Sequence, residues 1–201
     1  MGYLSNRMVS NASWPRTIFA AGVFILGSVV VSAAAPDTGY ERGALVYSGG
    51  TVVLVGSQER RVVFGGALRA SRFDRRLTLD RLPGRIVYET SYTYSNGSRK
   101  GRPRNTYHGL GATVLARYEF PYHGGMRIYS EVGWGLFLTS RISTDVNNPV
   151  NSTPVAGVGL VIPSRGDEFS IGVRFWHISN AGTNLPNKGQ NQLLLVAGWR
   201  W

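Results

Sequence analysis

Residues 107–120 read YHGLGATVLARYEF, and two kinds of side chain alternate along the whole stretch. The even-numbered positions are mostly apolar and comprise His108, Leu110, Ala112, Val114, Ala116, Tyr118 and Phe120. The odd-numbered positions are mostly small or charged and include Gly109, Gly111, Thr113, Arg117 and Glu119. Because successive side chains of a β-strand point to opposite faces, the stretch predicts a strand with one apolar and one polar or small face.

Seven more segments show the same alternation, separated by Gly, Pro, Asn, Ser and charged residues. The eight predicted strands are 45–56, 61–70, 85–95, 107–120, 126–140, 153–162, 168–179 and 190–201. From residue 45 onward no long segment has a helical period, and the first of the eight strands is the least regular. The sequence therefore predicts an all-β chain.

Eight alternating strands fit either a soluble barrel with its apolar face inward or an outer-membrane barrel with its apolar face toward lipid. The charged residues distinguish the two, because both signs fall on the faces opposite the apolar sets. These residues are Arg61, Arg69, Glu89, Arg117, Glu119, Arg127, Glu131 and Arg174. A small barrel fills its interior with side chains, so these charges are predicted to pair inside it. The predicted fold class is an eight-stranded antiparallel transmembrane β-barrel.

The last predicted strand ends the chain on an aromatic residue. Leu193, Leu195, Ala197, Trp199 and Trp201 share one face of it. This strand resembles the terminal strand of bacterial outer-membrane proteins, whose final aromatic residue serves the barrel-assembly machinery. That machinery is therefore a predicted partner through Trp201. An ordinary edge strand that happens to end in Trp is the alternative.

The N-terminal residues have the pattern of a secretory signal peptide. Arg7 and Arg16 precede the apolar stretch 17–31, and small residues follow at 32–35. A transmembrane anchor is the alternative, because the apolar run is about long enough to cross a bilayer. No basic cluster follows the run directly, which favours the signal. We therefore expect a signal peptide at 1–34, a barrel domain at 35–201 and a location in the bacterial outer membrane.

The composition limits the classes of partner. The chain of 201 residues has 22 Lys and Arg against 11 Asp and Glu, a formal net charge of +11. Such an excess suits nucleic acid, an anionic membrane surface or a phosphorylated ligand, and export argues against nucleic acid. The absence of Cys excludes disulfides and thiolate metal sites. No other spacing predicts a metal site or a cofactor.

Loop lengths indicate an orientation. With both ends of the barrel in the periplasm, the outer loops are 57–60, 96–106, 141–152 and 180–189. Two inner turns, near Tyr122 and Arg165, are short, as is usual for such barrels. The third inner connection, 71–84, is long and rich in Arg, and we interpret it as a segment that carries a short periplasmic helix.

A polar motif interrupts the lipid-facing set of the seventh predicted strand. Ile171, Val173, Phe175, His177 and Ser179 share a face, so a base and a nucleophile are neighbours on the outer wall near its extracellular rim. A structural histidine is the alternative interpretation. Polar groups at a membrane boundary are more often functional, which favours a catalytic site.

The string HISNAG at 177–182, followed by PNKG at 186–189, resembles the PagL-type lipid A 3-O-deacylases of Gram-negative outer membranes. The resemblance is strong over 174–189 and weak over most of the remaining barrel. It implies an eight-stranded barrel whose outer wall hydrolyses the ester at position 3 of lipid A. It also implies that Ser179 is the nucleophile and His177 its general base. Asn180 and Gly182 would then stabilise the oxyanion, and Asn187 would shape the same loop.

One position departs from the family. The third catalytic residue of that family is a glutamate fourteen positions after the histidine, and here the position holds Asn191. Its location on the outward face is right, but the negative charge is missing. Glu119 and Glu131 are predicted to point into the lumen, whereas Asp145, on an outer loop, remains a candidate substitute. We therefore expect a serine-type esterase weakened at this position.

The basic residues of the outer loops suit a substrate that carries phosphate groups, as lipid A does. The candidate phosphate-binding residues are Arg99, Lys100, Arg102, Arg104 and Lys188. A merely solvated loop is the alternative for the first four. A barrel without catalytic activity, which binds lipopolysaccharide or has a structural or adhesion role, is the competing function. The sequence leaves open whether two copies form a homodimer.

Overall fold

The computed structural model describes residues 39–52, 59–80, 82–99, 102–143, 145–185 and 187–201, so the predicted signal peptide lies outside it. The strands are β1 Glu41–Thr51, β2 Arg60–Leu79, β3 Leu82–Arg99, β4 Arg102–Pro121, β5 Arg127–Thr139, β6 Val150–Ser152, β7 Val155–Ser164, β8 Asp167–Ile178 and β9 Gln190–Arg200. A 3-10 helix, η1, spans His123–Gly125. In the described part of the chain, no helix has the length and apolar character needed to span a bilayer.

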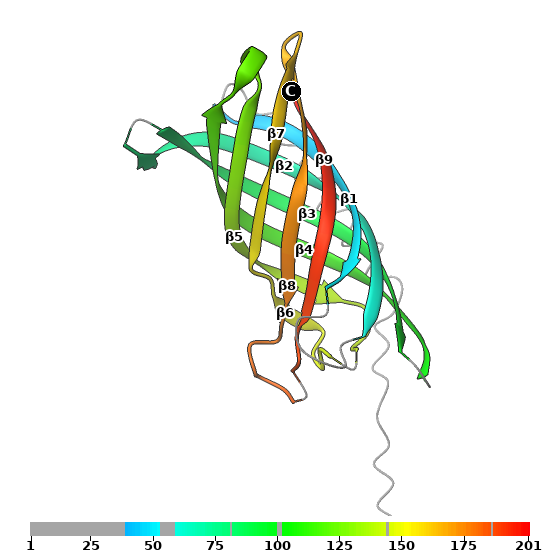
Figure 1. Cartoon of the computed structure of the whole chain (residues 1–201). Coiled ribbons are helices and arrows are strands. Elements are labelled where there is room, and N and C mark those ends of the chain that lie inside the picture. The colour runs from blue at the N-terminus through cyan, green and yellow to red at the C-terminus, as the bar shows by residue number, and fades with distance from the viewer. Residues whose placement is uncertain (1–38, 53–58, 81, 100–101, 144, 186) are drawn as a thin grey trace, which may run out of the picture.

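The strands form one closed antiparallel barrel (Figure 1). β1 pairs with β9, and β4 pairs with β5, so the sheet has no free edge. β6 and β7 both pair with β5 and are successive pieces of one barrel strand. The barrel therefore has eight strands, and the predicted fold class is confirmed.

Two hairpins are longer than the sequence pattern indicated. β2 and β3 run to Leu79 and from Leu82, and Asp80, with φ 53°, lies in the turn between them. The short helix predicted within 71–84 is therefore wrong. At the other end, β3 and β4 occupy most of the predicted loop 96–106. Beyond the barrel wall both faces of the β2–β3 hairpin are largely exposed, which removes the alternation by which a strand is recognised.

The apolar side chains of the strands face outward, as predicted. Val132, Trp134 and Leu195 are 58%, 54% and 66% exposed on the outer wall. The neighbouring inward positions hold buried residues such as Phe137 and Leu194. Lipid would cover this outer wall, because a barrel in a membrane presents an apolar band to the bilayer.

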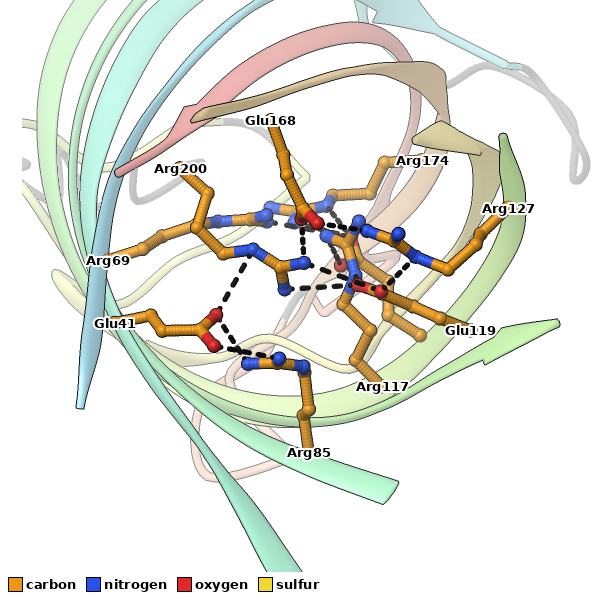
Figure 2. Close-up of polar contacts among 10 residues, drawn as sticks. Glu41, Arg69, Arg85, Arg117, Glu119, Arg127, Glu168, Arg174 and Arg200 are labelled. Atoms are coloured by element: carbon orange, nitrogen blue, oxygen red, sulfur yellow. Dashed lines mark hydrogen bonds and ion pairs between the residues drawn. The ribbon is translucent and has the colours of Figure 1, made fainter. Parts of the chain in front are cut away.

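The charged residues pair inside the barrel, as predicted. Arg174 lies between two carboxylates, with Nη1 2.9 Å from Glu89 and Nη2 2.5 Å from Glu131. Arg69 also contacts Glu89, at 2.8 Å, and Arg117 contacts Glu131, at 3.5 Å. Figure 2 shows the three arginines converging in the lumen. We call these five residues the lumen cluster.

A second set of ion pairs lies where the chain ends. The Arg200 guanidinium contacts the carboxylates of Glu41, Glu119 and Glu168, which lie on or beside β1, β4 and β8 (Figure 2). Arg85 Nη1 contacts Glu41 at 2.5 Å. The last strand is thus joined by charge to both neighbouring strands and to one across the lumen.

Candidate active site

His177 and Asn191 are register partners in β8 and β9. Their side chains share the outer wall, and the imidazole Nδ1 lies 2.7 Å from Asn191 Oδ1. Because an amide oxygen only accepts, Nδ1 donates and carries the ring proton. The lone pair of Nε2 is therefore available to accept a proton, which is the state that a general base requires.

Ser179 follows directly after β8 and shares the outward direction of His177. Its Oγ accepts hydrogen bonds from Asn187 Nδ2 at 3.0 Å and from the backbone N–H of Ala181 at 3.2 Å. Within the described ranges, no hydrogen bond joins Ser179 to His177. Catalytic hydrogen bonds are often long without substrate, so the shared face and the two-residue spacing are the relevant geometry.

The strand opposite His177 is interrupted by a proline. The backbone N–H of His177 donates to the carbonyl of Pro154 at 3.0 Å. Pro154 has no N–H, so the reciprocal hydrogen bond of this antiparallel pair cannot form. The interruption between β6 and β7 therefore lies beside the imidazole.

Asn180 builds the turn that follows the serine. Its side chain is buried, accepts from the backbone N–H of Gly182 at 2.9 Å and donates to the carbonyl of Asn184 at 2.7 Å. Ala181 and Gly182 have φ values of 54° and 79°, a conformation that glycine tolerates best. The structure thus places Asn180 and Gly182 in the scaffold of the turn. The donors that contact Ser179 Oγ come from Ala181, which sequence reasoning missed, and from Asn187.

The neighbouring outer loop holds this turn from the side. Asn147 Nδ2 donates to the carbonyl of Leu185 at 3.0 Å, and Asn148 Nδ2 donates to Thr183 Oγ1 at 3.2 Å. The backbone carbonyl of Asp145 accepts from the N–H of Lys188 at 2.9 Å. The position of Ser179 therefore depends on residues from two loops.

Gly189 packs against the imidazole, a contact that the sequence analysis missed. It has φ 67°, and a Cβ added there would lie 2.6 Å from His177 Cε1. The ring thus has little space on that side, which restricts its rotation about the Asn191 hydrogen bond. The glycine that ends the PNKG string, 186–189, was the only signal in the sequence for this role.

The remaining candidates are spread over the barrel. The Asp145 carboxylate is buried and accepts from the backbone N–H of Glu59 at 2.6 Å, so it is engaged elsewhere than at His177. Arg104 is exposed on β4, with β5 and β6–β7 between β4 and β8. Lys188 is exposed in the loop that connects β8 to β9. Lys100 lies outside the described residues, as do the side chains of Arg99 and Arg102. The described ranges contain no group of three metal-ligating side chains.

Comparison with known proteins gives a family and a fold. The family model described as lipid A 3-O-deacylase (PagL) matches residues 70–200, which include both loops of the site. The solved structure of the outer membrane enzyme PagL is 23% identical, with a TM-score of 0.52 over 78% of this chain and 97% of that chain. Neisserial surface protein A (NspA) is 14% identical, with a TM-score of 0.56 over 81% and 96%. At these identities the two structures support the barrel fold alone, and no curated protein sequence matches the chain.

Proposed function

The chain belongs to the PagL family of lipid A 3-O-deacylases, and we propose from this premise that it hydrolyses the ester of the 3-O-linked acyl chain of lipid A in the bacterial outer membrane. The observation that carries the proposal is the placement of His177, Ser179 and Asn191 on the lipid-facing wall. A substrate held in the bilayer reaches such a site by lateral diffusion, without entering the lumen.

The proposed reaction begins with attack of Ser179 Oγ on the ester carbonyl carbon. His177 Nε2 takes the hydroxyl proton, while Asn191 Oδ1 holds Nδ1–H and the ring orientation. Ala181 N–H and Asn187 Nδ2 are close to Oγ and suited to donate to the developing oxyanion. Collapse of the tetrahedral intermediate expels the sugar alkoxide, which takes the proton from the imidazolium.

Water completes the cycle. It attacks the acyl-serine carbonyl while His177 accepts its proton, and the fatty acid leaves as Ser179 is reprotonated. Each step uses the same two side chains, so one geometry serves acylation and deacylation. Lys188, exposed in the same loop, is proposed to attract a phosphate of the substrate.

Lipid A analysis tests this function directly. We expect that expression of the full chain in a Gram-negative strain whose lipid A retains the 3-linked hydroxyacyl group removes the mass of one such group. The measurement is mass spectrometry of extracted lipid A, with an empty-vector strain as the control. An unchanged profile, with the barrel folded in the outer membrane, would favour the competing function of a lipopolysaccharide-binding barrel without activity. The observation that supports this alternative is Asn191, which stands where the family has an acidic residue.

Asn191 gives a prediction about the rate. Asp is isosteric with Asn and keeps the 2.7 Å contact to Nδ1 while adding a charge that stabilises the imidazolium. We expect Asn191→Asp to raise kcat on the order of tenfold, because the neutral amide already fixes the tautomer but not the charge. Asn191→Ala should be slower than the native chain. The check is the release of free hydroxyacid from purified variants, and equal rates in all three would remove Asn191 from the mechanism.

A further inference from the structure

A second group of outward side chains lies on β2, β3 and β4, at the end of the barrel that carries Ser179. These side chains form three rows that run across the strands and follow one another toward the strand ends. We call it the β2–β4 wall. Its aromatic row is Phe64, Tyr94 and His108, and its middle row is Val62, Asn96 and Thr106. Two positions further along β2 and β4, toward the loops, lie Arg60, which pairs with Ser98 of β3, and Arg104, beside an irregularity in the β3–β4 register; we call these two arginines the basic row. Side chains thus change from aromatic to polar to cationic toward the strand ends.

The aromatic row is organised by one hydrogen bond. Tyr92, one outward position below Tyr94, has its Oη 2.6 Å from His108 Nδ1, and the two rings stack with centroids 5.9 Å apart. Tyr94 packs edge-on against the same imidazole, with centroids 5.5 Å apart. With the phenol as donor, His108 Nε2 carries the ring proton and can donate to a ligand. A histidine on a lipid-facing wall requires such a polar neighbour, since unpaired polar groups in hydrocarbon are costly.

The basic row supplies two charges. Arg60 and Arg104 are exposed, and in the described part of the chain the side chains of both lack an ion-pair partner. Arg60 and Arg104 each lie four residues from the aromatic row along their strands, so their Cα atoms are about 14 Å from those of Phe64 and His108. An anion held by the basic row would therefore lie in the headgroup region while aromatic and apolar side chains contact the layer below.

We propose that the β2–β4 wall binds one phosphorylated, acylated sugar lipid of the outer leaflet without hydrolysing it. Arg60 and Arg104 would donate to phosphate, and His108 Nε2–H to a sugar or phosphate oxygen. The acyl chains would lie on the outward faces of Phe64, at 53% exposure, and Val114, at 45%.

The distances favour a sugar lipid over a glycerophospholipid. A single phosphodiester headgroup is too small to reach the basic row and the aromatic row together across about 14 Å. A phosphorylated disaccharide spans that distance, and its rings can stack on tyrosine. β5 and β6–β7 separate this wall from β8 on one side, so the bound molecule is distinct from the one that would react at Ser179. The proposal is therefore independent of the proposed hydrolysis.

The test counts lipids bound to the folded full chain. In a Ser179→Ala background, native mass spectrometry with bis-phosphorylated hexa-acyl lipid A should detect two bound molecules, one on each wall. Arg60→Gln with Arg104→Gln should remove one of them and weaken its Kd at least tenfold. The matched control is Arg75→Gln with Arg76→Gln, which removes two exposed charges from the β2–β3 hairpin at the other end. Heat-modifiable migration on a gel verifies folding of each variant.

Three outcomes would overturn the proposal. The first is unchanged lipid A binding in the Arg60→Gln, Arg104→Gln variant. The second is an equal loss in the Arg75→Gln, Arg76→Gln control, which would indicate a non-specific effect of charge. The third is equal binding of phosphatidylglycerol at the same wall, which would exclude selectivity for a sugar lipid. Absence of hydrolysis in the native chain would refute the proposed function and leave these binding results valid.

Discussion

Ser179→Ala is expected to reduce hydrolysis of the 3-O-acyl ester by at least about 10⁴-fold, since the residual rate would come only from the oxyanion donors and from binding. The barrel should remain folded, because Ser179 faces outward and, among the described residues, its hydroxyl hydrogen-bonds with Ala181 of the following turn and with Asn187. The measurement is the rate of hydroxyacid release from lipid A in micelles, together with the heat-modifiable gel shift of the purified variant.

Three further variants make this result interpretable. His177→Ala should cause a loss of similar size, and the double variant should be little worse, because residues that act as a unit are strongly non-additive. Ser130→Ala removes another outward serine, on β5, and should retain the native rate. Near-native turnover of Ser179→Ala would contradict the assignment of the nucleophile.

Arg174→Gln is expected to lower the free energy of unfolding by about 3–5 kcal/mol, the usual cost of breaking a buried ion pair from one side. The guanidinium lies between Glu89 and Glu131, and all three side chains are at most 4% exposed. Among the described residues, its removal leaves Arg69 and Arg117 as the remaining partners of these carboxylates. Urea unfolding of the barrel in lipid vesicles gives the free energy.

A compensating variant distinguishes the effect of the lost charge on stability from the effect of altered packing. Adding Glu131→Gln to Arg174→Gln removes one orphaned charge and should recover part of the lost stability. Arg75→Gln, on the exposed hairpin, is the control and should change the stability little. If the Arg174→Gln variant and the native chain unfold at the same urea concentration, the lumen cluster does not stabilise the barrel as described.

Much of the fold was predictable because a strand in a membrane barrel must alternate apolar, lipid-facing side chains with lumen-facing ones. On the barrel wall each strand meets lipid on one side and the lumen on the other, so 107–120 and 190–201 alternate and were assigned to strands. The segment 71–84 has water on both sides, loses the period and was misread as the place of a helix. The short strand β6, Val150–Ser152, was missed, because it lies at the end of the segment 141–152 that was interpreted as an outer loop.

The part of the candidate site that lies within one hairpin, β8 and β9, was predictable. His177 and Asn191 lie fourteen positions apart on two adjacent strands, so their pairing follows from the hairpin. The donors around Ser179 were not predictable, since they depend on backbone angles in the turn. Ala181, rather than Gly182, offers its N–H to Oγ because the Asn180 side chain has already engaged the glycine amide. The support from Asn147 and Asn148 joins loops more than thirty positions apart, which no local pattern reports.

The proline opposite His177 removes one hydrogen bond from the wall beside the candidate site. A regular antiparallel pair is held by two hydrogen bonds, and the Pro154–His177 pair has one. β8 can therefore tilt there with less resistance than at the pairs on either side. In the proposed mechanism, a shift of this kind would change the separation of Ser179 Oγ and His177 Nε2 when the acyl chain of the substrate contacts the wall.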